Sequence, residues 1–288
     1  MKIREVVEKI LAYHPHLEGY EGCDDYKCGD PEKECTGVVC ALSPNISVIN
    51  EAIRLNANLI VVHEPTFYTS QDGPGWFEDF GNKVYEEKKK LLDEHGICIW
   101  RDHDHMHAHD PDSIFTGVLK YVDWEKDAFT DRDTGLFSHF IVKIEGMKVK
   151  DLAKYLIDKI GINGARIVGD EEAIVHTAAL VGHLYPMDYR KKDGTKGEYS
   201  VKVIETLEKG ADVIIPGEVI DWTVLSYIND AAALGHKKAA IILGHYNWEE
   251  LGMRYMKDWL SELLENKPEV TYVPSRDMYH YVKKGEES

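Results

Sequence analysis

Residues 57–65 read ANLIVVHEP, a largely apolar run that stops at His63, Glu64 and Pro65. Such a run is typical of a parallel strand that is buried on both faces. Similar runs occur at 38–42 and 96–100, and segments with helical spacing lie between them at 46–55 and 79–95. This alternation of strands and helices predicts an α/β lobe with a mostly parallel sheet.

A second series of strands and helices follows residue 133. Strands are predicted at 138–144, 165–168, 175–181, 211–215 and 239–243, with helices at 149–160, 200–209 and 247–266. We therefore predict two α/β lobes with mixed, mostly parallel sheets. The first lobe would comprise residues 1–125 with 236–288, and the second residues 126–235.

The composition limits the classes of partner. The formal net charge is -17, which argues against a nucleic acid or an anionic membrane surface. No apolar run approaches the roughly 20 residues that a membrane span needs, and the charged first helix is unlike a signal peptide. The five cysteines form no zinc-knuckle spacing, and we expect them to be reduced thiols; a structural zinc site or a redox pair at Cys23, Cys28 and Cys35 is the alternative. We expect a cytoplasmic protein.

A histidine-rich stretch follows the strand predicted at 96–100. Residues 101–110 read RDHDHMHAHD, with His103, His105, His107 and His109 at every second position. If the stretch is extended, the four imidazoles project to one side. Neutral imidazole is the commonest metal ligand among side chains, and a carboxylate often holds its other nitrogen. The stretch is therefore either a metal site or a solvated loop.

Other metal-ligand types are predicted at the carboxyl ends of strands, where sites form in open α/β sheets. Glu64 and Glu218 follow two similar helix–strand units, and His245 follows a third. In GHYNWEE (244–250), Asn247 and Glu250 have the spacing of a capping box, which would place Glu249 in the first helical turn.

Together these residues predict a metal site between the two lobes, at the strand carboxyl ends. Mixed histidine and carboxylate ligands suit Zn, Fe, Mn or Co. With at least five ligands on offer, two divalent transition-metal ions could bind side by side and activate a water for hydrolysis.

The chain resembles the NIF-three-like family, whose members are often labelled type 2 GTP cyclohydrolase 1 homologues. The motifs that carry the resemblance run from residue 22 almost to the C-terminus. They are GDPEKECTGVVCAL (29–42), NANLIVVHEP (56–65), HDHMH (103–107), PGE (216–218) and GHYNWE (244–249). The last matches the family pattern Gly-His-Tyr-x-x-Glu and is the most specific.

The resemblance implies a dinuclear metal centre. His63, His245 and Glu249 match family ligands directly, and Glu249 would bridge the two ions. Glu64 stands where the family has a second histidine, and His107 stands where it has an aspartate, so the two exchanges together preserve the ligand charge. His103 matches a histidine near the site in the family. It would be either a third ligand or a residue that hydrogen-bonds to the ligands.

We predict a metal-dependent hydrolase that acts on a small polar or phosphorylated compound, whose identity the sequence does not reveal. Glu249, His103 and Glu218 are the candidate catalytic residues, and the basic segment 190–192 could hold an anion. The alternative is a non-catalytic metal-handling or regulatory oligomeric protein. The resemblance also implies a homo-oligomer, of which a hexameric ring is one form; the GTP cyclohydrolase label comes from resemblance alone.

Overall fold

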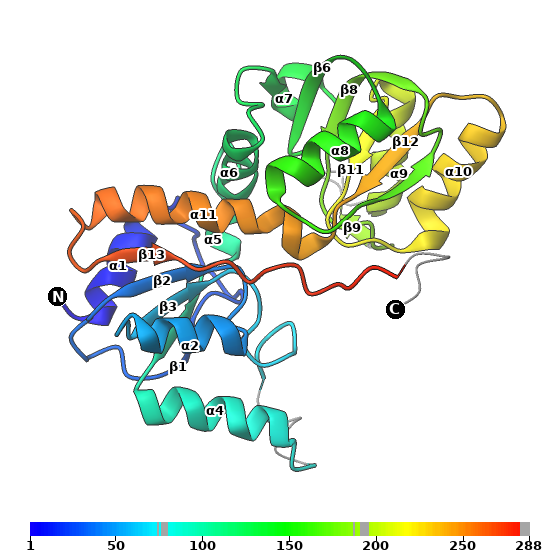
Figure 1. The fold of residues 1–288 in the computed structure, drawn as a ribbon. Coiled ribbons are helices and arrows are strands. Elements are labelled where there is room, and N and C mark those ends of the chain that lie inside the picture. Colours follow the sequence, from blue (N-terminus) through cyan, green and yellow to red (C-terminus); the bar gives the residue numbers. More distant parts are fainter. Residues whose placement is uncertain (74, 76–79, 187, 191–195, 283–288) are drawn as a thin grey trace. The chain divides into compact units, whose positions relative to one another are not determined.

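The apolar run at 57–62 forms β3 (Leu59–Val62), the central strand of a five-stranded sheet in the computed structural model (Figure 1). The structure describes residues 1–73, 75, 80–186, 188–190 and 196–282. Parallel neighbours of β3 are β2 (Val38–Ala41) and β4 (Cys98–Arg101). Every residue of these three strands is buried, which agrees with sequences that are apolar except for Arg101, whose guanidinium donates to backbone oxygens of His63 and Ser70. The sheet order is β1 (Tyr26–Cys28), β4, β3, β2 and β13 (Val270–Tyr272), with only β1 antiparallel to its neighbour.

Helices α2 (Ile46–Arg54) and α4 (Lys83–His95) pack on one face of this sheet. Asn45 and Asn82 cap them, as each side chain accepts backbone N–H groups of the first turn. Helices α1 (Ile3–Tyr13) and α11 (His245–Leu263) lie on the other face in Figure 1. The α/β fold class is thereby confirmed.

The second sheet has six strands. Their order is β5 (Ala128–Phe129), β6 (Phe140–Lys148), β8 (Ile174–Leu180), β11 (Val213–Ile215), β12 (Ala239–Ile242) and β7 (Arg166–Gly169). Only the pairings of β11 with β8 and β12 are parallel, so the expected parallel majority holds in the first sheet and not here. Residues 170–173 join β7 to β8, and a link this short cannot make a parallel crossover.

The chain divides into two compact units. Unit 1 comprises Met1–Gly117 with Glu250–Arg276, and unit 2 comprises Val118–Glu249 with Asp277–Ser288. In unit 2 a buried core lies between the sheet and α9 (Tyr199–Lys209), η1 (Asp221–Leu225) and α10 (Ser226–Ala233). Helix α8 (Val149–Ile160) contributes further buried side chains. The remaining elements are α5 (Asp104–His107), α6 (Ser113–Tyr121), α7 (Asp131–Thr134), β9 (Asp188–Arg190) and β10 (Lys196–Glu198).

The structure differs from the sequence-based expectation at two places. Residues 104–107 form the helical turn α5, so the condition that the histidine stretch is extended is not met. Asn247 does not cap α11, because the helix already begins at His245 and the Trp248 N–H donates to Gly244 O (3.1 Å). The carboxylate of Glu250 accepts the backbone N–H of Ser275 and forms no capping box.

Three further expectations concern membrane spans, cysteines and the basic segment. Across the part of the chain that the structure describes, no helix has the length and apolar character to cross a bilayer. The five cysteines are free thiols. Of the basic segment 190–192, Lys191 and Lys192 lie outside the described residues.

Helices α6 and α11 approach closely within unit 1, at Gly117 and Gly252. A Cβ added to Gly117 would lie 2.7 Å from the Cβ of Tyr255 and 2.8 Å from the Cα of Gly252. We expect Gly117→Ala to lower the free energy of unfolding by about 1–3 kcal/mol, because neither backbone can move away freely. Urea unfolding measures the change. Gly73→Ala is the control, since no atom lies within 4 Å of its added Cβ; an equal effect in both variants would contradict the prediction.

Candidate metal centre

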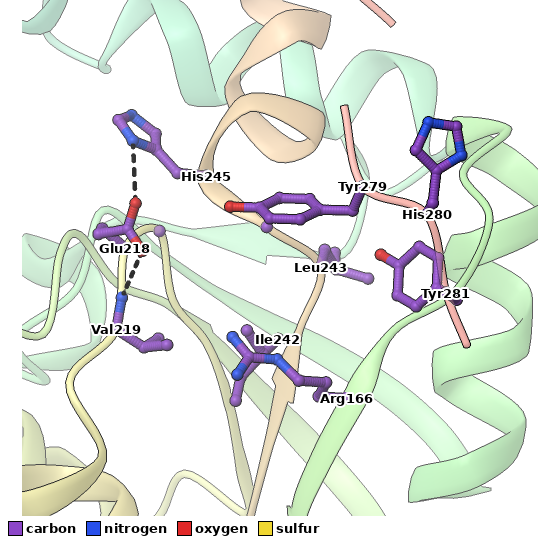
Figure 2. A pocket seen from close by; sticks show the side chains of 11 residues that line it. Arg166, Glu218, Val219, Ile242, Leu243, His245, Tyr279, His280 and Tyr281 are labelled. Atoms are coloured by element: carbon purple, nitrogen blue, oxygen red, sulfur yellow. Dashed lines mark hydrogen bonds and ion pairs between the residues drawn. The ribbon is translucent and has the colours of Figure 1, made fainter. Parts of the chain in front are cut away.

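In unit 2, two candidate residues lie at the carboxyl edge of the second sheet. Strands β11 and β12 are parallel, so the residues that follow them emerge at the same edge. Glu218 follows β11 and His245 follows β12. Figure 2 shows their side chains facing each other, with 3.9 Å between His245 Nδ1 and a carboxylate oxygen of Glu218. This pair was expected from the sequence to lie at strand ends.

Glu249 lies one helical turn after His245, on the same face of α11. Its Oε2 atom is 2.9 Å from His245 Nε2. The side chain of Glu249 is only 2% exposed. A buried carboxylate needs a cation or hydrogen bonds to offset the loss of hydration. The two residues therefore have the spacing and burial expected of a pair of metal ligands.

His183 lies beside this pair, and no sequence motif had pointed to it. Ligand atoms of His183, His245 and Glu249 all lie within 4.8 Å of one another. The Glu218 N–H donates to His183 Nδ1 (2.9 Å), so the proton of the neutral ring is on Nε2. A Cβ on Gly217 would lie 2.6 Å from this Nδ1 atom, so glycine is needed there. His183 follows β8 closely, and this strand-end position was the signal that could have identified it.

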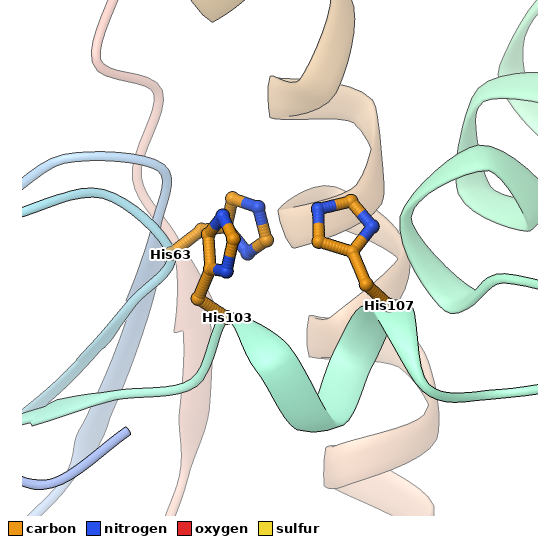
Figure 3. A group of neighbouring side chains, drawn as sticks. All are labelled: His63, His103 and His107. Carbon is orange, nitrogen blue, oxygen red and sulfur yellow. The ribbon is translucent and has the colours of Figure 1, made fainter. Parts of the chain in front are cut away.

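In unit 1, three of the predicted ligands converge. Figure 3 shows His63, which follows β3, facing His103 and His107 at the two ends of α5. Ligand atoms of the three residues lie within 4.8 Å of one another. His103 and His107 are four residues apart, so the helical turn brings them to one face. The turn itself is held by Asp24, whose carboxylate accepts the N–H groups of residues 103, 104 and 105.

The three imidazoles share one hydrogen-bonding pattern. His63 Nδ1 is 3.2 Å from the backbone oxygen of Asp102. His103 Nδ1 is 2.8 Å from Asp104 Oδ1, and His107 Nδ1 is 2.7 Å from Asp112 Oδ2. Donation from each Nδ1 leaves the lone pair of each neutral ring on Nε2. Imidazoles that bind metals typically have this arrangement. The donor chemistry therefore fits a divalent transition-metal ion.

Other candidates have different surroundings. Glu64 is buried directly after His63. His105 belongs to a separate group with Asp24 and Asp102, and its Nδ1 is 2.7 Å from Asp24 Oδ2. Cys23 forms a group with His103 and Asp104, but burial raises the pKa of this thiol to about 12 and disfavours the thiolate that binds metal. That one site combines the candidates of both units stays a prediction.

The contact between His107 and Asp112 can be tested. We expect Asp112→Asn to weaken metal binding by about 10–100-fold, because the neutral amide holds the imidazole less strongly. Asparagine can still cap α6 through its side-chain oxygen, which Asp112 does by accepting the Phe115 N–H. Competition with a chromophoric chelator measures the affinity. Unchanged affinity in a folded variant would remove His107 from the ligands.

The fold and these groups define a class of protein: a two-sheet α/β protein with histidine and carboxylate clusters that could hold metal ions. A family model described as Duf34/NIF3 (NGG1p interacting factor 3) matches residues 1–278. The chain belongs to this family, which confirms the resemblance seen in its motifs.

Individual relatives are distant. A protein of Clostridium acetobutylicum named GTP cyclohydrolase 1 type 2 homolog is 23% identical over 226 residues, which cover 77% of this chain and 75% of the relative. The crystal structure of Staphylococcus aureus protein SA1388 has a TM-score of 0.70 at 19% identity, with 98% of this chain and 99% of that chain covered. A Bacillus cereus protein related to NIF3 has a TM-score of 0.66 at 14% identity, with 97% of both chains covered. At these identities the structures support the fold alone.

Proposed function

We propose that this protein binds two divalent transition-metal ions and hydrolyses a small polar or phosphorylated compound. The observation that carries the proposal is the pattern shared by His63, His103 and His107: each Nδ1 faces an oxygen acceptor, so that Nε2 would be the ligand atom. Glu64, His245 and Glu249 would supply the other ligands. Such ions polarise a substrate oxygen or activate water for attack.

The side chains around the ligands would handle protons and orientation. Glu218 is partly exposed and lies within 3.9 Å of His245, so it could accept a proton from the attacking water. His103 and Glu249 combine ligand and catalytic roles in the proposal. His183 carries its proton on Nε2 and could donate a hydrogen bond to the substrate.

Metal analysis tests the first part of the proposal. Protein purified without a histidine tag should contain about two transition-metal ions per chain, and paramagnetic resonance of the manganese form should show whether the ions are coupled. Hydrolysis of a panel of small esters and amides, with and without chelator, tests the second part. Metal-free protein from metal-supplemented cells would refute the proposal.

The alternative is a protein that handles metal without turnover. It depended on His105 and His109 as extra ligands beside the site. Among the described residues, His105 belongs to a separate group with Asp24 and Asp102, and neither histidine is grouped with His63. Rapid transfer of the ions to a chelator without any turnover would favour this alternative over the hydrolase.

We further propose a homo-oligomer, which the sequence resemblance implies. Analytical ultracentrifugation of the metal-loaded protein should give a mass several times that of one chain. A monomer at micromolar concentration would contradict this.

A further inference from the structure

A pocket of about 400 Å³ lies within unit 2, beside His245. Its floor is formed by the carboxyl ends of β11 and β12, and its outer wall by residues 279–281. This volume suits a small-molecule ligand. Because His245 and Glu218 line the pocket, a ligand bound there would lie against the proposed metal ligand.

The pocket contains one guanidinium group. Arg166 is the first residue of β7, which is antiparallel to β12 and pairs Arg166 with Ile242. Arg166 therefore lies at the same edge of the sheet as His245. Within the described residues it forms no ion pair with a carboxylate, although the chain has 51 acidic residues and 34 basic ones. An arginine that pairs with no carboxylate among the described residues, and whose planar guanidinium suits two-point binding, favours an oxyanion as ligand.

Two aromatic rings complete the pocket. Figure 2 shows Tyr279 and the Arg166 guanidinium extending toward the side where Glu218 and His245 lie. The Tyr281 hydroxyl donates to Gly164 O (3.1 Å), which holds this ring in place. The rings are 54% and 39% exposed, so their faces are open to a ligand. Exposed aromatic faces bind flat rings by stacking.

We propose that this pocket holds the substrate, and that the substrate is a ring compound with an oxyanion group, either phosphate or carboxylate. Its ring would stack on Tyr279 and its oxyanion would bind Arg166, which leaves its remaining polar groups beside His245. The inference rests on the proposed function, because His245 is one of the proposed metal ligands. It adds the substrate class and assigns Arg166 and Tyr279 to substrate binding.

Calorimetry with four non-hydrolysable probes tests the inference on the metal-loaded full chain. Phenylphosphonate and benzoate carry a ring and an oxyanion, and methylphosphonate and acetate carry the oxyanion alone. We expect at least one aromatic probe to bind about tenfold more tightly than its ring-free counterpart. Which aromatic probe binds more tightly identifies the oxyanion.

Variants connect the binding to the pocket. Arg166→Gln should lower the affinity for the preferred aromatic probe about tenfold, while the metal content stays unchanged. Tyr279→Leu should remove the advantage of the aromatic probe over its ring-free counterpart. Arg54→Gln is the control, because it removes the same charge from an exposed arginine of unit 1 that pairs with Glu51. It should change the affinity neither for the aromatic probe nor for its ring-free counterpart.

Several outcomes would overturn the inference. These are equal affinity for aromatic and ring-free probes, or full affinity in Arg166→Gln. If removal of the metal abolishes binding but Arg166→Gln does not, the oxyanion binds the ion and the pocket assignment fails while the proposed function stands. If the protein never retains metal but still binds the probes in a way that depends on Arg166, the proposed function is refuted and the assignment of the pocket stands.

Discussion

Glu249→Gln is expected to lose most of the bound metal, with a decrease in affinity of at least tenfold. Glutamine has nearly the same shape but no negative charge, and it binds transition-metal ions far more weakly than a carboxylate does. Glu249 is buried and touches His245, so no water can easily replace its oxygen as a ligand. Elemental analysis of tag-free protein, before and after dialysis against a weak chelator, measures the loss.

Glu250→Gln is the matched control. It removes the same charge from the next residue of the same helix, but the Glu250 carboxylate accepts the backbone N–H of Ser275 and belongs to none of the metal-ligand groups. The glutamine oxygen can still accept this hydrogen bond, so we expect full metal content and a change in stability of about 1 kcal/mol or less. Equal retention of metal in both variants would remove Glu249 from the site.

The stability of the protein should depend on Lys88 above pH 8. This lysine is only 3% exposed, and its Nζ donates to the backbone oxygen of Thr66 (2.6 Å). Burial lowers the pKa of Lys88 to about 8 from its usual 10.5. Between these two pH values the unfolded chain holds a proton that the folded chain has lost. The free energy of unfolding contributed by Lys88 therefore rises with pH across this window, by up to about 3 kcal/mol.

The comparison of wild type with Lys88→Met isolates this contribution. Methionine preserves the apolar packing beside Phe67 and Tyr68 but cannot titrate. Buried tyrosines and cysteines with raised pKa values act in the opposite direction, and they are common to both proteins. Urea unfolding at pH 7, 8, 9 and 10 should therefore show that the free energy of unfolding of the wild type rises with pH relative to that of Lys88→Met. A constant difference would contradict the lowered pKa.

The first sheet could be predicted because its strands are buried on both faces. An apolar run such as residues 59–62 has few alternatives to a central strand, and the polar residue that follows it must lie at the sheet edge. For this reason His63, Glu218 and His245 could be placed at strand ends from the sequence. The i, i+4 spacing of His245 and Glu249 also follows from the helix, although the predicted start of that helix was two residues late.

The histidine stretch could not be predicted, because its conformation depends on a distant residue. The alternation of His103, His105 and His107 suits a strand, but Asp24 holds three backbone N–H groups of the segment and stabilises a helical turn. That turn separates His105 from the other two. No local pattern in residues 101–110 reveals a cap that lies about 80 positions earlier.

The direction of β7 has a consequence for how related proteins could diverge. Strand β7 is antiparallel to β12, so the first residue of β7, Arg166, lies at the edge of the sheet that forms the pocket. Gly169, the last residue of β7, lies at the opposite edge. The position of the guanidinium therefore depends on the turn at 161–165, a segment that contains none of the proposed metal ligands. If the pocket holds the substrate as proposed, insertions or deletions in that turn would change which compounds bind and leave the proposed metal ligands in place, so selectivity and reactivity could evolve separately on this scaffold.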